Sequence, residues 1–277
     1  MQIYVINMTK AKDRLSRIQL QLQAQRLSWK RIEAIDGKAL NIKDSCINPY
    51  RFRLTQRRDC LPGEIGCMES HRLAWETALK QNCAHTLILE DDAILPDDLK
   101  VTLESIESKT ELDIINLSFC GTYPLSNEKL KRLKSACMSL RPYFRGKKDW
   151  KEIEAKRWKI FSLLPVNKLT LCECSMMPPF MTAYVVTPRA CKALLDASKN
   201  ASFCNDYTYR FTAGSIRQAF SFPAYVHQDP ELKSITGIRP SEITLSLWNR
   251  MLRFILKRRP IRRQLAVVRM YGIKGIL

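Results

Sequence analysis

The sequence predicts an α/β fold, because short apolar runs typical of buried strands alternate with amphipathic segments typical of helices. The first 37 residues already read as strand, helix and strand, the unit from which parallel sheets are built. The chain has 277 residues, 45% of them hydrophobic and 26% charged, so it can bury a large core without disulfides. This composition excludes a disordered or fibrous chain.

The N-terminal unit begins with Ile3–Asn7, an apolar run with β-branched residues that predicts a buried strand. Thr9 can N-cap the next helix, whose apolar positions step by four, three and four residues: Ala11, Leu15, Ile18 and Leu22. Arg31–Ile35 predicts a second strand, and the turn-forming pair Asp36-Gly37 ends it.

The same alternation continues to about residue 240. Pro62-Gly63 begins a helix, and Pro188 begins another that runs to about Lys199. The first of these helices has a buried stripe of Ile65, Met68, Trp75 and Leu79. Further strands are predicted at Thr86–Leu89, Asp113–Ser118, Ala183–Thr187 and Phe220–Val226. The stretch Pro124–Pro179 has weak periodicity, so we expect a long excursion from the sheet there.

Positive charge is concentrated in two segments of the chain. There are 46 Lys and Arg against 27 Asp and Glu, a net charge of +19. Lys129–Lys159 has 12 basic and 3 acidic residues, and Ile243–Leu277 has 9 basic and none acidic, so each carries +9. We expect a domain over residues 1–240, a basic amphipathic tail over residues 241–277, and a partner that bears phosphates or carboxylates.

The expected compartment is the cytosol. The opening residues lack the cationic and apolar regions of a signal peptide, and no run approaches the roughly 18 apolar residues of a membrane span. The ten cysteines have no paired spacing, so we expect reduced thiols rather than disulfides or a zinc site.

Three adjacent carboxylates follow a predicted strand in the sequence LILEDDAIL, residues 87–95. Glu90, Asp91 and Asp92 would emerge at the carboxyl end of that strand, where open α/β sheets bind ligands. A bound cation would relieve their mutual repulsion, and oxygen ligands favour Mg²⁺ or Mn²⁺, which commonly also hold a substrate phosphate. The alternative is a solvated loop in which the acids cap the next helix.

Several motifs resemble glycosyltransferase family 25 in their order and spacing. They are YVINM with K-x-x-D-R at residues 4–14, EAIDG-x-x-L at 33–40, GEIGCMESHRLAWE at 63–76, and LILEDDAIL. Two later segments, AYVVTPRACKALL and FPAYVHQD, also resemble the family, so the resemblance covers about residues 2–229. The family comprises lipo-oligosaccharide core enzymes, with collagen galactosyltransferases as relatives.

The resemblance implies a GT-A type fold, with a Rossmann-like mixed sheet flanked by helices, that binds a nucleotide-sugar through a divalent cation. It implies Mn²⁺ or Mg²⁺ as cofactor, UDP-galactose as donor, a lipo-oligosaccharide or lipopolysaccharide core as acceptor, and inversion to a β linkage. Within the acidic motif it assigns Asp92 to the metal, Asp91 to the metal or the ribose, and Glu90 to the donor sugar or the metal shell.

Residues after the first two strands are expected to contact the nucleotide. Asn7 and Arg14 follow the first strand, the usual place for contacts to the base. Asp36, at the end of the second strand, could accept hydrogen bonds from uracil or ribose. Arg14 could equally be an exposed helix residue, and Asp36 a plain turn former.

Glu64, Ser70 and His71 lie on the helix that precedes the acidic strand. They match a family motif, which implies a role in donor binding or in shaping the site. His71 borders the buried stripe of its helix, so a hydrogen-bonded core histidine is the alternative.

Two late residues are further candidates. Asp206 matches a family position and is our candidate for the general base on the acceptor hydroxyl, with N-capping of the next helix as the alternative. His227 ends the last strand and is a candidate metal ligand, with a polar strand-edge residue as the alternative. Thr182 departs from the family pattern, because relatives often carry a histidine there.

The tail predicts an amphipathic helix. Leu245, Trp248, Leu252 and Ile255 form an apolar stripe, and basic residues lie on another face: Arg250, Arg253 and Lys257. We expect this helix to bind an anionic membrane surface, at the inner face of the cytoplasmic membrane, close to a lipid-linked acceptor. The alternative is a helix packed on the sheet with a solvated basic end.

Two other functions could use the same features. A nucleotidyl- or phosphotransferase could use the three acids, but neither common glycine-rich phosphate loop occurs among the nine glycines. A nucleic-acid-binding protein would exploit the charge of +19, but no zinc-finger, helix-turn-helix or RNP signature occurs. The sequence therefore predicts a metal-dependent glycosyltransferase, with no nucleic acid among its partners.

Overall fold

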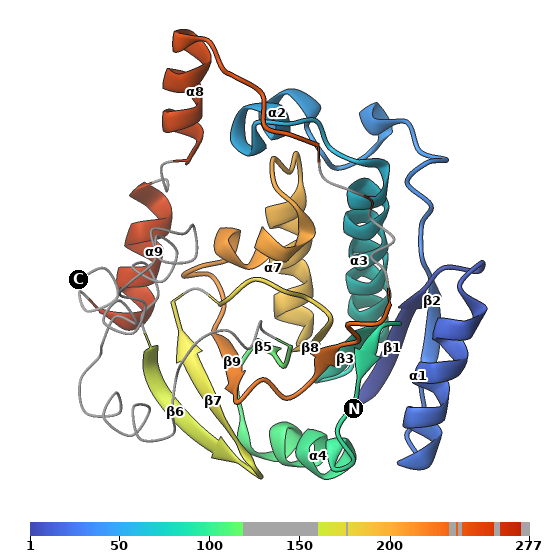
Figure 1. Cartoon of the computed structure of the whole chain (residues 1–277). Helices are drawn as coiled ribbons and strands as arrows, with labels where there is room; N and C mark the ends of the chain where they lie inside the picture. The colour runs from blue at the N-terminus through green and yellow to red at the C-terminus, as the bar shows by residue number, and fades with distance from the viewer. Residues whose placement is uncertain (119–159, 176, 233–236, 238–239, 258–260, 273–277) are drawn as a thin grey trace.

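The computed structural model describes residues 1–118, 160–175, 177–232, 237, 240–257 and 261–272. An eight-stranded mixed sheet, in the order β2-β1-β3-β8-β5-β9-β7-β6, is flanked by helices (Figure 1). This architecture confirms the predicted α/β, Rossmann-like fold class.

The strands that form the large sheet are β1 (Gln2–Asn7), β2 (Lys30–Glu33), β3 (Thr86–Glu90), β5 (Ile114–Asn116), β6 (Ile160–Val166), β7 (Leu169–Cys174), β8 (Ala183–Val186) and β9 (Gln218–Phe222). β1 pairs in parallel with both β2 and β3, whereas β8 runs antiparallel between β3 and β5. The carboxyl ends of β1, β2 and β3 therefore meet at one edge of the sheet. There, β4 (Ala93–Ile94) and β10 (His227–Gln228) form a small antiparallel pair.

Helices cover both faces of the sheet, and others lie beyond these two layers. They are α1 (Lys12–Ala24), α2 (Pro49–Gln56), α3 (Pro62–Gln81), α4 (Leu99–Lys109), α7 (Pro188–Ser198), α8 (Leu247–Lys257) and α9 (Ile261–Tyr271), with short 3₁₀ turns η1 (Ile42–Asp44) and η3 (Asn205–Phe211). α3 and α7 pack on one face through side chains such as Trp75 and Leu194. α1 and α4 pack on the other through side chains such as Ile18 and Leu103.

A close contact fixes the turn after β2 against the first turns of α3. A Cβ added at Gly37 would lie 1.7 Å from the carbonyl oxygen of Pro62, and one added at Gly66 would lie 2.5 Å from that of Ile35. Only glycine lets the two backbones approach so closely. This contact holds the carboxyl end of β2 beside the N-terminus of α3.

The structure differs from the sequence-based expectation in three elements. The strand expected at Phe220–Val226 is β9, which spans Gln218–Phe222. Thr9 is not the N-cap of α1, which begins at Lys12; its hydroxyl bonds Glu33 instead. The stretch Pro124–Pro179 is not wholly an excursion, because its last part forms the hairpin β6–β7. β6 is an edge strand with partly exposed side chains on both faces, so its sequence lacks the strict alternation of a half-buried strand. The basic segment Lys129–Lys159 lies outside the described residues, which resume with β6 at Ile160.

The basic tail contains two helices, which take different positions. α9 packs on the domain, with Val267 buried and the ring of Tyr271 stacked on that of Phe161 at 3.9 Å between centroids. α8 lies beside α2, away from the sheet (Figure 1). Among the described residues, no helix is both long and apolar enough to cross a bilayer.

Candidate functional site

A pocket of about 400 Å³ opens at the carboxyl ends of β1, β2 and β3, against the N-terminal half of α3. Most of the predicted site residues line it: Asn7, Arg14, Asp36, Ser70, His71, Glu90, Asp91 and Asp92. The pairing of β1 with β2 and β3 explains this convergence, since the three strands end side by side.

Asp91 is held by two predicted residues, Asn7 at the end of β1 and Arg14 on α1. Asn7 donates from Nδ2 to Asp91 Oδ2 at 2.7 Å, and Arg14 donates from Nη1 to Oδ1 at 3.0 Å. Burial raises the pKa of Asp91 more than these two donors lower it. Asn7 and Arg14 thus orient an acid at the pocket wall.

Asp92 has one satisfied and one unsatisfied carboxylate oxygen. Oδ2 accepts from Gln228 Nε2 at 3.0 Å and lies 3.5 Å from Arg14 Nη1. Oδ1 is buried and has no hydrogen-bond partner among the described residues. Burial, with the negative charges of Glu90 and Asp91, raises the pKa of Asp92 to about 6. A buried oxygen with a free lone pair in an acidic cluster fits a divalent cation.

Glu90 is held by α3 and by the chain before β8. His71 Nε2 lies 3.1 Å from Glu90 Oε1, and Thr182 donates from Oγ1 to Oε2 at 3.2 Å. Burial raises the pKa of Glu90, but these two hydrogen bonds and the positive charge of Arg14 outweigh the effect of burial, so the pKa lies below its ordinary value. Thr182, where the sequence departs from the family pattern, therefore contacts the acidic motif directly.

A buried chain of hydrogen bonds sets the direction of the His71 contact. Trp75 can only donate, and its Nε1 lies 2.8 Å from the Tyr184 hydroxyl, which also lies 2.8 Å from His71 Nδ1. If Tyr184 accepts from Trp75 and donates to Nδ1, the ring proton of His71 is on Nε2 and points to Glu90. With this neutral tautomer, Trp75, Tyr184, His71 and Glu90 all take part in hydrogen bonds with a matching donor and acceptor.

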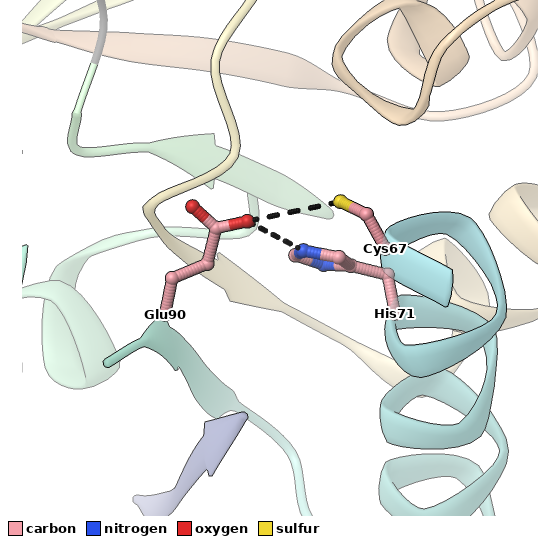
Figure 2. A group of neighbouring side chains, drawn as sticks. All are labelled: Cys67, His71 and Glu90. Carbon is pink, nitrogen blue, oxygen red and sulfur yellow. Dashed lines mark hydrogen bonds and ion pairs between the residues drawn. The ribbon is translucent and has the colours of Figure 1, made fainter. Parts of the chain in front are cut away.

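Cys67 lies next to this chain, and Figure 2 shows its thiol directed with His71 toward Glu90. The three potential ligand atoms lie within 4.8 Å of one another, with the sulfur 4.0 Å from Glu90 Oε1. Burial raises the pKa of Cys67 well above its ordinary value, and the charges of Glu90 and Asp206 raise it further. A cation here would have to displace the protons of both Cys67 and His71, so we interpret the group as hydrogen-bonding support for Glu90.

Ser70 and Asp36 shape the wall of the pocket below β2. Ser70 Oγ accepts from the backbone N–H of Ile35 at 2.8 Å and donates to the carbonyl of Gly66 at 2.6 Å. Asp36 is exposed, pairs with Lys10 at 2.9 Å and accepts from the backbone N–H of Lys38. Both residues thus have local structural partners as well as a place at the pocket.

Glu64 does not line the pocket. It is buried against Arg58, with its two carboxylate oxygens 2.5 and 2.7 Å from the guanidinium, and accepts from the backbone N–H of Leu61 at 3.0 Å. It therefore caps α3 and neutralises a buried arginine. Sequence reasoning missed Arg58, because its partner is fixed by the tertiary fold and by no short motif.

Asp206 and His227 lie outside the pocket lining as well. Asp206 is half-buried on η3, and its charge acts on Cys67 at the pocket wall. His227 is exposed in β10, where it pairs with Ile94, and its neighbour Gln228 is the residue that reaches Asp92. Neighbouring side chains of a strand point to opposite faces, a signal that could have directed attention to Gln228.

The match to a family model decides the family of this chain. The model for glycosyltransferase family 25, described as an LPS biosynthesis protein, matches residues 1–209 and so includes β1, α3 and the acidic motif. The chain belongs to glycosyltransferase family 25. This confirms the resemblance on which the predicted donor site was based.

The curated relatives include proteins named galactosyltransferases and proteins named inactive. The chain is 34% identical to human procollagen galactosyltransferase 2 over 112 residues, which cover 37% of this chain and 17% of that protein. It is 33% identical to the mouse protein of that name over 126 residues, covering 40% and 19%. It is 26% identical to human inactive glycosyltransferase 25 family member 3 over 140 residues, covering 46% and 23%. The matches thus span about a fifth of these longer relatives.

Proposed function

We propose that this family 25 chain is a glycosyltransferase that uses UDP-galactose as donor and binds it in the pocket at the ends of β1, β2 and β3. The observation that carries the proposal is the convergence of Asn7, Arg14 and the acids Glu90, Asp91 and Asp92 on one pocket wall. Arg14 and the N-terminus of α3 supply positive potential for a diphosphate. The procollagen galactosyltransferases among the relatives support galactose as the sugar.

Asp92 would hold a divalent cation, Mn²⁺ or Mg²⁺, with Asp91 as its neighbour. Its unsatisfied Oδ1 is the oxygen that fits this role. Such an ion, when bound, stabilises the negative charge that develops on a departing diphosphate. Arg14 neutralises the same two acids and would have to share or yield its contacts to an ion. The proposed role of His227 as a metal ligand would need its exposed side chain to turn toward Asp92, because its neighbour Gln228 is the residue that reaches this acid.

Within this mechanism, Glu90 would accept hydrogen bonds from hydroxyls of the donor sugar. His71 and Thr182 hold both of its oxygens, which fixes the carboxylate before the donor arrives. Glu64 would act at a distance from the donor, by fixing the start of α3.

We propose Asp206 as the general base. It would take the proton of the acceptor hydroxyl while that oxygen attacks C1 of the sugar and the bond from C1 to the diphosphate oxygen breaks, which inverts C1 to a β linkage. Its charge already reaches Cys67 at the pocket wall. Asp206→Asn is expected to lower kcat at least about a hundredfold with little change in the donor Kd; an unchanged kcat would exclude this role.

The proposed acceptor is the core saccharide of a lipo-oligosaccharide or lipopolysaccharide. The description of the family model as an LPS biosynthesis protein supports it. The basic segment Lys129–Lys159 could contact the phosphates of such an acceptor.

The test is calorimetry of the full chain against UDP-galactose, UDP-glucose, UDP-N-acetylglucosamine and GDP-mannose, each with and without Mn²⁺. We expect UDP-galactose to bind most tightly, and Mn²⁺ to increase its affinity. Asp92→Asn is expected to abolish the Mn²⁺ dependence, while Asp97→Asn, an exposed acid five residues further on, leaves it unchanged. A folded Asp92→Asn variant that keeps the full Mn²⁺ effect would contradict the metal assignment.

A further inference from the structure

α8 has a continuous apolar face that is exposed. Five large side chains on this helix are 60% to 79% exposed: Leu247, Trp248, Met251, Phe254 and Ile255. Their spacing of one, four, seven and eight residues from Leu247 places them on one side of the helix. Single exposed apolar residues are common, whereas a group of five on one helix face is typical of an interaction surface.

The opposite side of α8 is attached to the domain. Arg253 donates from Nη2 to the carbonyl of Thr55 at 3.5 Å, which joins α8 to the end of α2. Just before the helix, the backbone N–H of Ile243 donates to the carbonyl of Arg57 at 2.6 Å, and Leu245 is buried. These contacts fix which side of α8 faces outward. The apolar face is therefore presented by the folded domain.

The helix that carries this face has charge of one sign. α8 contains three basic residues and no acidic one. Arg250 is exposed on α8 itself, adjacent to the apolar face. The surface thus combines large apolar side chains with cationic ones, and its own segment contains no acid to neutralise them.

We propose that the exposed face of α8 docks on the surface of an anionic lipid bilayer, with the helix lying in the headgroup plane. The apolar side chains would enter the boundary between headgroups and acyl chains, and Arg250 would bind lipid phosphates. The docking depends only on α8; the further idea that it brings the pocket to a lipid-linked acceptor rests on the proposed function.

Charge and chemistry favour a bilayer over other occupants. Two copies meeting through this face would bring together two helices that each carry three basic residues and no acidic one, and these repel. A nucleic acid would bind the arginines but would leave most of the aliphatic side chains without apolar contacts. An anionic bilayer offers apolar contacts to the apolar side chains and phosphates to the basic ones.

The test is sedimentation of the full chain with vesicles of phosphatidylcholine alone or with one third phosphatidylglycerol. We expect binding to the anionic vesicles, a blue shift of the Trp248 fluorescence, and weaker binding at high salt. The double variant Trp248→Glu, Phe254→Glu is expected to bind about tenfold or more weakly. The control Leu20→Glu, Val101→Glu changes two exposed apolar residues on α1 and α4 and should bind like the parent.

Equal vesicle binding by the Trp248→Glu, Phe254→Glu variant and the parent would overturn the proposal. So would a stable dimer in sedimentation velocity that this variant abolishes, since the face would then be a contact between copies. Thermal melts of each variant check folding. UDP-galactose calorimetry on the same proteins separates the two proposals, because donor binding can fail while vesicle binding is kept, or the reverse.

Discussion

His71 Nε2 lies 3.1 Å from Glu90 Oε1, a contact that joins a helix on one face of the sheet to the first acid of the EDD motif. The imidazole is 1% exposed, so the contact is shielded from water. A shielded hydrogen bond to a carboxylate is stronger than an exposed one, and it limits the rotamers of Glu90. α3 thus acts as a rigid support for the acidic strand end.

The hydrogen-bond chain behind His71 predicts that replacing Tyr184 by phenylalanine destabilises the protein more than replacing Tyr209. Tyr184→Phe removes the hydroxyl that joins Trp75 to His71, and is expected to lower the free energy of unfolding by about 1–3 kcal/mol. The matched control is Tyr209→Phe, whose hydroxyl is buried without a partner among the described residues and should cost little or nothing. Urea denaturation measures both, and equal losses would contradict the proposed chain.

The same chain predicts the tautomer of His71. The sequence has only three histidines, so nitrogen shifts of the imidazole rings can be assigned by NMR. We expect the His71 proton on Nε2 in the parent protein and a changed ring signal in Tyr184→Phe. A proton on Nδ1 would make His71 the donor to the Tyr184 hydroxyl, and would leave Nε2 available as a metal ligand.

Glu64 and Arg58 form a buried ion pair, and we expect the loss of one partner to destabilise the fold. Arg58→Met leaves a buried carboxylate without its counterion, and should lower the free energy of unfolding by about 3–5 kcal/mol. Adding Glu64→Gln should restore much of this loss, because the uncompensated charge disappears. The donor Kd of each folded variant is the second measurement: a large loss of donor affinity without loss of stability would instead support direct donor binding by Glu64.

The Gly66→Ala substitution has two opposing effects on stability, a gain in helix propensity and a steric clash. Alanine favours a helix by about 1 kcal/mol over glycine, but here its Cβ would lie 2.5 Å from the backbone oxygen of Ile35. A backbone atom cannot rotate away as a side chain can, so we expect a net loss of about 1–3 kcal/mol and weaker donor binding. Thr77→Ala, on the same helix, is the control that raises propensity without this clash. A stabilised Gly66→Ala variant would show that the turn after β2 is free to move.

His85 predicts a dependence of stability on pH. Burial lowers its pKa below the ordinary value of 6.5, with Glu107 opposing the shift and the N-terminal amine adding to it. Below pH 6.5 the unfolded chain takes up a proton that the folded chain does not, so this contribution to stability is present above pH 6.5 and is lost as the pH falls. The free energy of unfolding of His85→Gln, measured by urea titration, should fall less between pH 7 and pH 5 than that of the parent. An equal fall in both proteins would contradict a role for His85 in this pH dependence.

Local patterns were enough to predict the parts of the fold that are apolar and regular. Ile3–Asn7 and Thr86–Leu89 are continuous apolar runs, and both are buried strands in the structure. The hairpin β6–β7 was missed because an edge strand is only partly buried, which weakens the hydrophobic pattern. The prediction that Thr9 caps α1 was wrong, because Thr9 bonds Glu33 on the neighbouring strand β2, and helix-capping signals do not include such a contact.

By itself the sequence determined the α/β class, the family and the acidic strand end, since each depends on residues that are close together along the chain. Only the tertiary structure decided how each acid is held: Glu90 by His71 and Thr182, Asp91 by Asn7 and Arg14, and Asp92 by Gln228 with one oxygen free. It also decided that Glu64 turns to Arg58 and that the apolar side of α8 faces outward. Most of these hydrogen bonds join segments far apart in the chain, and the Arg58–Glu64 pair spans a turn whose geometry follows from no regular helix or strand spacing. Local sequence patterns therefore could not predict them.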